Sequence, residues 1–237
     1  MADKKKQSKH QPAKKQGDTF TRYLVIGMIA LIVLAGVGAA LAKNHSNSHA
    51  PVPASVTKAD GYGISLNPTA KVKVDMFEDF RCPNCKNFEA VNNTYINNLV
   101  RTGKINAVYH PMSFIAPDSA IAAAAAACAG DQGKFLEMHT ALYANQPDSS
   151  TTPESTAYWT NAQLILLGHS LGITSKDFDT CVNSGKYIPW TKNIAADAAA
   201  RNINGTPTVI VNGKTLPLAT DYDAKAFTKV FTDLGIK

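Results

Sequence analysis

The sequence has 237 residues, 45% of them hydrophobic, and a formal net charge of +6. This length supports one domain with a sizeable core and some additional tail, whereas two full domains would be cramped. Seven basic side chains lie in residues 1–22 against two acidic ones, so the rest of the chain is almost neutral. It lacks the basic stripe that follows nucleic-acid phosphates, which argues against nucleic-acid binding.

The N-terminal part of the chain has the pattern of a membrane anchor. Residues 1–22 are polar and aperiodic, which predicts a disordered tail. Residues 23–41 carry no charge, and as a helix of roughly 28 Å they would span a hydrocarbon core of about 30 Å. Because the basic cluster precedes this run, the positive-inside rule places residues 1–22 in the cytoplasm and the chain after residue 41 outside. We therefore expect a single-pass protein of the cell membrane.

A cleaved signal peptide is the alternative interpretation of this segment. Ala40-Leu41-Ala42 has small residues at the spacing of a cleavage site. The apolar run is longer than the roughly 7 to 15 residues of a signal peptide's apolar core, which favours an uncleaved anchor. In both cases the remainder is exported, into a compartment in which disulfides form and persist. Residues 42–60 are rich in His, Ser, Asn and Pro and are expected to form a flexible stalk.

A folded domain is expected over residues 61–237, beginning with a strand, a helix and a strand. Residues 71–77 alternate charged and apolar side chains, which is a strand pattern of period two. Residues 82–101 predict a helix, because they place apolar side chains at helical spacing: Phe88, Val91, Tyr95, Ile96 and Leu99. Residues 105–109 predict the second strand.

The rest of the domain is expected to be a helical insertion followed by a hairpin and a helix. The insertion covers about residues 117–202, with helices at 117–130, 134–143, 162–171, 176–183 and 190–201. Residues 208–211 and 214–218 predict strands joined by the turn Asn212-Gly213, and residues 222–234 predict a closing helix. This order indicates an α/β domain.

The motif Cys82-Pro83-Asn84-Cys85 follows a predicted strand and opens a predicted helix. Unpaired N–H groups at a helix N-terminus favour a thiolate and lower a cysteine pKa from about 8.5 to between roughly 3.5 and 7.5. Cys82 is therefore the expected nucleophile, and Cys85, one turn later, the expected resolving thiol. Pro83 falls where a first helical turn tolerates proline.

The other two cysteines bear on the alternatives for this dithiol. A zinc site needs two further ligands, usually a second close pair, and Cys128 and Cys181 lie far apart in the sequence. We therefore expect no metal. A structural Cys82–Cys85 bridge would close too small a loop to stabilise the fold much. For Cys128 and Cys181 a structural disulfide is the simplest account, and a second redox pair is the alternative.

Three motifs in this order resemble the DsbA-like branch of the thioredoxin superfamily, and in particular the membrane-anchored DsbA-like proteins of Gram-positive bacteria. They are FEDFRCPNC at 77–85, CAGDQGKF at 128–135 and GTPT at 205–208. The resemblance covers about residues 60–237 and implies a thioredoxin fold with a helical insertion. It also implies that Thr206-Pro207 forms a cis-proline loop that faces the dithiol and offers backbone to a substrate peptide.

The chain departs from the family pattern at one position. Thioredoxin and the enterobacterial DsbA carry a buried acid six residues before the first cysteine, where this chain has Met76. Glu78 and Asp79 are nearer to the dithiol, and Glu78 could relay a proton when Cys85 ionises. The alternative is a strand end whose acids are simply solvated.

The sequence and the resemblance together predict an extracytoplasmic oxidase that forms disulfides in reduced or unfolded exported proteins. The resemblance implies re-oxidation by a membrane partner of the DsbB or VKOR type, and no dissociable cofactor. A disulfide reductase or isomerase of the same fold is the first alternative. A non-catalytic peptide-binding module with an inert disulfide is the second.

Overall fold

The computed structural model describes residues 50–217 and 223–236. The expected tail and the expected membrane anchor at 23–41 lie outside these residues. Within the described part of the chain, no helix is long and apolar enough to cross a bilayer.

The core of the domain is one five-stranded sheet with the order β1-β3-β2-β4-β5. Its strands are β1 (Ile64–Leu66), β2 (Val72–Glu78), β3 (Ile105–Pro111), β4 (Thr208–Val211) and β5 (Lys214–Thr215). Strand β2 lies in the middle, parallel to β3 and antiparallel to β4. Asn212 and Gly213 join β4 to β5 with φ of 47° and 82°, the positive values that a tight hairpin turn requires. The expected turn is thus present.

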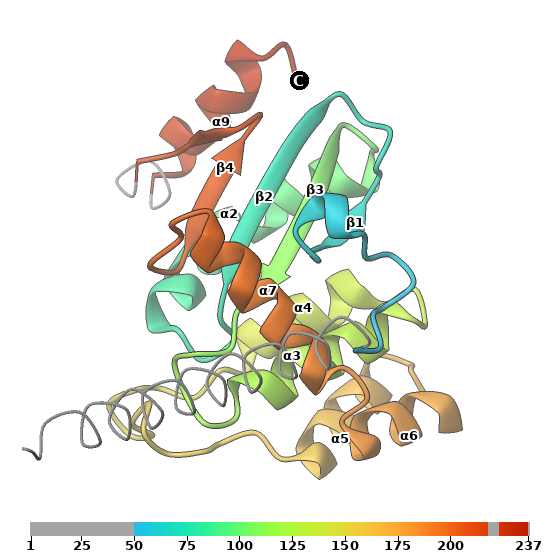
Figure 1. The fold of residues 1–237 in the computed structure, drawn as a ribbon. Helices are drawn as coiled ribbons and strands as arrows, with labels where there is room; N and C mark the ends of the chain where they lie inside the picture. The colour runs from blue at the N-terminus through green and yellow to red at the C-terminus, as the bar shows by residue number, and fades with distance from the viewer. Residues whose placement is uncertain (1–49, 218–222, 237) are drawn as a thin grey trace, which may run out of the picture. The chain divides into compact units, whose positions relative to one another are not determined.

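Helices cover both faces of this sheet (Figure 1). Helix α2 (Pro83–Arg101) lies behind the strands, and α7 (Ile188–Ala200) crosses in front of them. Helix α9 (Ala224–Asp233) packs against α2, where the rings of Phe88 and Phe227 meet edge to face at 5.7 Å. On the α7 side, Arg201 lies 4.8 Å from the ring of Phe77.

The helical insertion forms a bundle next to the sheet, and its last helix, α7, continues across one face of the sheet. It contains α3 (Ser119–Gly130), α4 (Phe135–Ala144), α5 (Asn161–Ser170), α6 (Lys176–Ser184) and α7. Helix α3 is in contact with each of the other four. Its alanines from Ala122 to Ala129 are buried, and such small side chains allow neighbouring helices to approach closely. Cys128 of α3 and Cys181 of α6 are joined by a disulfide, with 5.9 Å between their Cα atoms.

The structure corrects the expectations at several points. Strand β1 was not expected, and the ordered domain begins before residue 61. Val56 pairs with Ile64, and the short helix Lys58–Asp60 lies in the expected stalk. Strand β5 has two residues, fewer than expected. In α2, Val91 is 41% exposed, because the buried stripe runs instead through Glu89 and Asn92.

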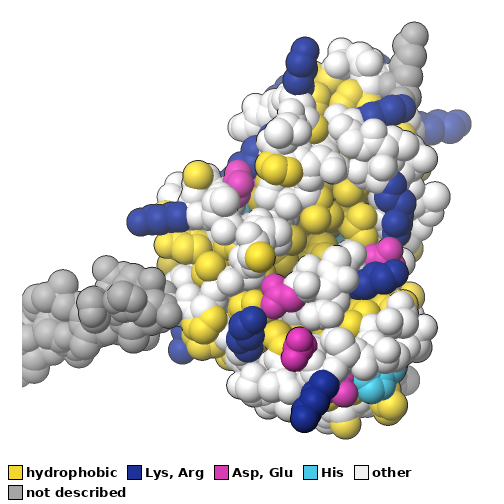
Figure 2. Space-filling model, turned by 90° about the vertical axis from the view of Figure 1, so that its right-hand side faces the viewer, with side chains coloured by type: hydrophobic (Ala, Val, Ile, Leu, Met, Phe, Trp, Pro, Cys, Tyr) yellow, Lys and Arg dark blue, Asp and Glu magenta, His cyan; other side chains and the backbone are white. Residues whose placement is uncertain are grey.

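Charged side chains are dispersed over the surface that Figure 2 shows. Lys and Arg are separated there by apolar and uncharged groups, Asp and Glu lie mainly in the lower half of the view, and there is no continuous basic area. This face therefore has no footprint for a nucleic-acid backbone, in agreement with the near-neutral composition after residue 22.

We predict that the double variant Cys128→Ser/Cys181→Ser is destabilised by about 2–5 kcal/mol, the usual effect of removing a native disulfide. The bridge joins residues 53 positions apart, so the unfolded chain gains much freedom without it. Thermal unfolding would measure the loss. The thiol reactivity of Cys82 in the folded variant should be unchanged. Loss of that reactivity in a folded variant would instead support a redox role for the pair.

Candidate active site

The dithiol lies at the junction between the central strand and helix α2. Cys82 is the residue before the helix and Pro83 is its first residue. The Asn84 and Cys85 backbone N–H groups at this helix start both lower the pKa of Cys82. Both cysteines are buried and both are free thiols, so the pair is in its reduced form. The sulfur of Cys82 thus lies where unpaired helical N–H groups favour a thiolate.

The two thiols differ strongly in acidity. A hydrogen bond from the Cys85 side chain, followed by hydrogen bonds from the Thr206 side chain and from the backbone N–H groups of the helix start, lowers the pKa of Cys82 to about 6. Burial raises the pKa of Cys85 well above its usual value, and the nearby charge of Glu78 raises it further. Cys82 therefore ionises near neutral pH while Cys85 keeps its proton. This is the asymmetry needed by an attacking thiol and a resolving thiol.

The Thr206-Pro207 loop faces this dithiol. Its peptide bond is cis, and the Cys82 thiol donates to the backbone carbonyl of Thr206 across 3.5 Å. Residues 124 positions apart in the sequence thus meet at one site. The dithiol and the Thr206-Pro207 loop, which we had expected to face each other, are therefore next to each other.

Asp79 holds the loops around the dithiol in place. It is fully buried, and its carboxylate accepts hydrogen bonds from the backbone N–H groups of Arg81, Phe114 and Ile115 at 2.9 to 3.1 Å. Burial raises the pKa of Asp79. The idea that this acid is solvated at a strand end is therefore wrong. Asp79 fixes the segment before α3 against the segment before Cys82.

Arg81 continues this network into the helical insertion. Its guanidinium donates to Asp118, and to the carbonyl of Thr156 at 3.0 Å. The other oxygen of Asp118 accepts from the backbone N–H groups of Tyr158 and Trp159 at 2.9 and 2.6 Å. Arg81 and Asp118 are 2% and 1% exposed at their side chains. The residue next to Cys82 is therefore tied to the insertion by a buried ion pair.

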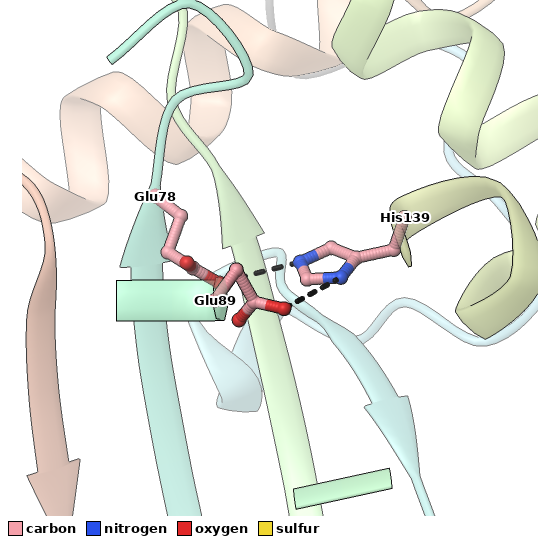
Figure 3. Close-up of side chains that lie close together, drawn as sticks. All are labelled: Glu78, Glu89 and His139. Carbon is pink, nitrogen blue, oxygen red and sulfur yellow. Dashed lines mark hydrogen bonds and ion pairs between the residues drawn. The ribbon is translucent and has the colours of Figure 1, made fainter. Parts of the chain in front are cut away.

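A second set of buried ionisable side chains lies close by, as Figure 3 shows. His139 of α4 points between Glu78 at the end of β2 and Glu89 of α2. One ring nitrogen lies 3.3 Å from Glu78 and the other 3.7 Å from Glu89. All three residues are at most 4% exposed. Glu78 is thus buried beside a partner, and the view of Glu78 as a solvated strand end is also wrong.

Glu89 and His139 were not expected at this site from the sequence. A signal was present for Glu89, because it follows Cys85 by four residues and so lies on the same face of α2. For His139 the signal was weaker. It follows Phe135 by four residues on the apolar face of α4, where a histidine is usually a satisfied core residue. Their proximity depends on how α2 and α4 pack together.

Glu78, Glu89 and His139 are also the one group among the described residues whose ligand atoms are close enough to hold a metal ion, all within 4.8 Å. The orientation of the His139 ring argues against metal binding. Its two nitrogens face different carboxylates, whereas a shared ion would take a single nitrogen lone pair. The arrangement is suited to holding a proton.

Residues 64–229 match the model of a family described as thioredoxin. The chain belongs to this family. Among solved structures, it is similar to the oxidised DsbA of Mycobacterium tuberculosis, with 30% identity over 70% of this chain and 83% of that one and a TM-score of 0.54. Thiol-disulfide oxidoreductases with a thioredoxin domain are the class of enzymes to which it is related.

Two further solved structures share the fold at lower identity. The MdbA protein of Actinomyces oris, a thiol-disulfide oxidoreductase, gives a TM-score of 0.66 at 22% identity, over 77% of this chain and 89% of that one. BdbD of Bacillus subtilis gives 0.61 at 21% identity, over 78% and 98%. At identities this low, the two matches show that the fold is shared and nothing beyond the fold.

The curated relatives are much longer proteins. The Na(+)/H(+) antiporter NhaA 1 of Mycobacterium sp. (strain KMS) is 28% identical over 155 residues, which are 64% of this chain and 23% of the antiporter. The antiporter of Mycolicibacterium gilvum matches in the same way, over 22% of its length. The chain thus spans about a quarter of the length of the curated relatives it matches.

We predict that the Cys82 thiolate, followed by its ultraviolet absorbance in the reduced protein, titrates with a midpoint near pH 6. Cys85→Ala should raise this midpoint, because the Cys85 hydrogen bond is the largest cause of the low pKa. Cys82→Ala serves as the control and should show no transition in this range, since the pKa of Cys85 is raised. A midpoint unchanged in Cys85→Ala would contradict this account.

A second prediction concerns the buried ion pair. Arg81→Met should lower the free energy of unfolding by about 3–5 kcal/mol, because it leaves the buried Asp118 carboxylate without a countercharge. The double variant Arg81→Met/Asp118→Leu should recover part of this loss, since no buried charge remains. Denaturant unfolding of both variants measures the difference. If the double variant is less stable than the single one, the uncompensated charge is not the cause.

Proposed function

We propose that this protein is an extracytoplasmic thiol-disulfide oxidoreductase that introduces disulfides into exported proteins through Cys82 and Cys85. The observation that carries the proposal is the contrast between the two sulfurs. Cys82 has a pKa of about 6 at a helix start, whereas that of the buried Cys85 is raised. The relationship to DsbA of Mycobacterium tuberculosis supports the same class of reaction.

The reaction follows from this contrast. A substrate thiolate attacks the Cys82 sulfur of the Cys82–Cys85 disulfide, and Cys85 leaves and takes up a proton. A second substrate thiolate then attacks the substrate sulfur of the mixed disulfide, and Cys82 leaves as a thiolate. A thiol of low pKa is a good leaving group, so this second step is favoured. The substrate loses two electrons and gains a disulfide, and the enzyme is left as the dithiol.

The same low pKa supports the oxidising direction. A thiolate that the fold stabilises exists only in the reduced protein, so its stabilisation makes the disulfide form a stronger oxidant. Thr206 and Pro207 next to Cys82 would supply the backbone on which an extended substrate peptide lies.

The proposal includes a location and a partner. The uncharged run at 23–41, preceded by basic residues, supports a membrane anchor with the catalytic domain outside the cytoplasm. The reduced dithiol needs an electron acceptor, for which a membrane oxidant of the DsbB or VKOR type is suited. No dissociable cofactor is required, because both electrons are carried by the sulfurs.

The reduction potential of the Cys82–Cys85 pair tests this function. We expect a value nearer to the about −120 mV of a strong oxidant than to the about −270 mV of thioredoxin. In cells, the pair should be mostly oxidised, and Cys85→Ser should accumulate mixed disulfides with exported proteins at Cys82. Cys82→Ser is the matched control and should trap none. A thioredoxin-like potential with a reduced pair would indicate a reductase, and a bridge that substrates do not reduce would indicate a binding module.

A further inference from the structure

The disulfide reaction creates a problem of charge at Cys85. When this sulfur leaves the disulfide it becomes a thiolate in a buried site, next to the charge of Glu78. A buried thiolate beside a carboxylate is costly, so the leaving sulfur needs a proton at the moment the bond breaks. That proton has to come from inside the protein, because the Cys85 side chain is fully buried.

The buried acids next to Cys85 are arranged to hold such a proton. Glu78 and Glu89 meet through a side-chain hydrogen bond, and burial together with the nearby charge of Glu78 raises the pKa of Glu89. His139 lies against both, 3.3 Å from Glu78 and 3.7 Å from Glu89. Two carboxylates this close and this deeply buried share one proton at neutral pH rather than ionise together.

The position of Glu89 on α2 connects this pair to Cys85 on one side and to solvent on the other. Glu89 follows Cys85 by one helical turn, so the two side chains lie on one face. Glu89 also lines a pocket of about 220 Å³ between α2 and α4, together with Lys86 of α2 and Thr140 of α4. A proton can therefore enter at Glu89 and reach Glu78, whose charge acts directly on Cys85.

We propose that Glu78 and Glu89 hold one shared proton, positioned by His139, and that this proton passes to Cys85 when its sulfur leaves the disulfide. The inference rests on the proposed function and extends it. Glu78 is the acid whose charge acts on Cys85, while Glu89 and His139 act through Glu78 as positioning residues. Met76, where related proteins carry an acid, lies two residues earlier on the same face of β2.

The step balances without any further reactant. The incoming thiolate forms a bond to the Cys82 sulfur, the Cys82–Cys85 bond breaks, and its electron pair goes to the Cys85 sulfur. The proton shared by Glu78 and Glu89 moves to that sulfur. The pair, now one proton short, takes up a proton through the pocket at Glu89. In the reverse reaction the pair accepts the proton from Cys85.

Several ionisable groups face this pair and belong to any account of its pH dependence. Burial and the nearby charge of Glu78 raise the pKa of Glu89 to about 8, although the charge of His139 opposes the shift. Burial lowers the pKa of His139 itself. The other groups that interact with the pair are Cys85, Tyr109 and Tyr143, and the charge of Asp79 acts on Tyr143. The transition near pH 8 is therefore assigned to the shared proton.

The test is the single-turnover reduction of the oxidised protein by dithiothreitol between pH 6 and pH 9. Once corrected for the dithiothreitol thiolate concentration, the wild-type rate should fall as pH rises through about 8. Glu89→Gln should lack this fall and react about 10²-fold more slowly at pH 7, the lower end of the effect of a positioned proton donor. Glu137→Gln is the matched control, because Glu137 of the same helix α4 as His139 pairs with Arg101 at the surface. It should behave as wild type.

A second measurement needs no variant. In the oxidised wild-type protein with ¹³C-labelled glutamate, an infrared band of a protonated carboxyl group should disappear near pH 8. Because only glutamate carries the label, its carboxyl band is shifted and can be told apart from that of the buried Asp79. Absence of this band at neutral pH, or a pH fall that persists in Glu89→Gln, would overturn the proposal. So would Zn²⁺ binding by the oxidised wild type that Glu89→Gln abolishes, because the cluster would then be a cation site. A wild-type disulfide that dithiothreitol does not reduce would instead contradict the proposed function.

Discussion

Helix α2 begins one residue after Cys82, where the central strand of the sheet ends, and this junction sets the charge that the sulfur can carry. The first N–H groups of a helix have no partner within the helix, so an anion next to them is stabilised. Proline at the first position costs nothing, because its missing N–H would have been unpaired. The helix start thus adds to the hydrogen bond from the Cys85 side chain, which is the largest cause of the low pKa of Cys82. The buried hydrogen bonds of Asp79 and Arg81 keep this part of the backbone in place.

The two sulfurs of the motif lie one turn apart and still meet opposite surroundings. Toward the helix start, Cys82 meets N–H groups and the loop at Thr206. Toward the core, Cys85 meets burial and the carboxylate of Glu78. A gradient from stabilised to destabilised negative charge therefore runs along one face of α2. Because of this gradient, Cys82 can leave a disulfide as a thiolate, whereas Cys85 leaves only when its sulfur takes up a proton.

Periodicity was sufficient for most of the fold and for part of the site. The helices of the insertion and the hairpin at 208–215 were expected near their observed positions, because their apolar spacing and turn residues are local signals. The short β1 was missed, since three residues carry too little pattern. The motif predicted Cys82 and Cys85 at a helix start, where the structure has them. The loop at Thr206-Pro207 required the family resemblance, because nothing in its local sequence indicates what it faces.

The buried ionisable groups were the hardest to predict, for a physical reason. An acid in a strand or helix is normally solvated, and only its neighbours in space can compensate for its burial. Glu78, Glu89 and His139 come from three different elements, so their compensation is invisible until β2, α2 and α4 are packed together. The same holds for Asp118, whose partners precede and follow it in the chain by tens of residues.

The bridge between α3 and α6 has a consequence for how far the insertion can open. It joins residues 53 positions apart, and the covalent loop that it closes contains α4 and α5. His139 of α4 lies in this loop, as do Tyr158 and Trp159, whose backbone N–H groups donate to Asp118. Local unfolding of α4 or α5 therefore cannot carry α3 away from α6, and the displaced segment stays within reach of its partners. The permanent disulfide thus limits how far the surroundings of Cys82 and Cys85 can separate while that other pair exchanges.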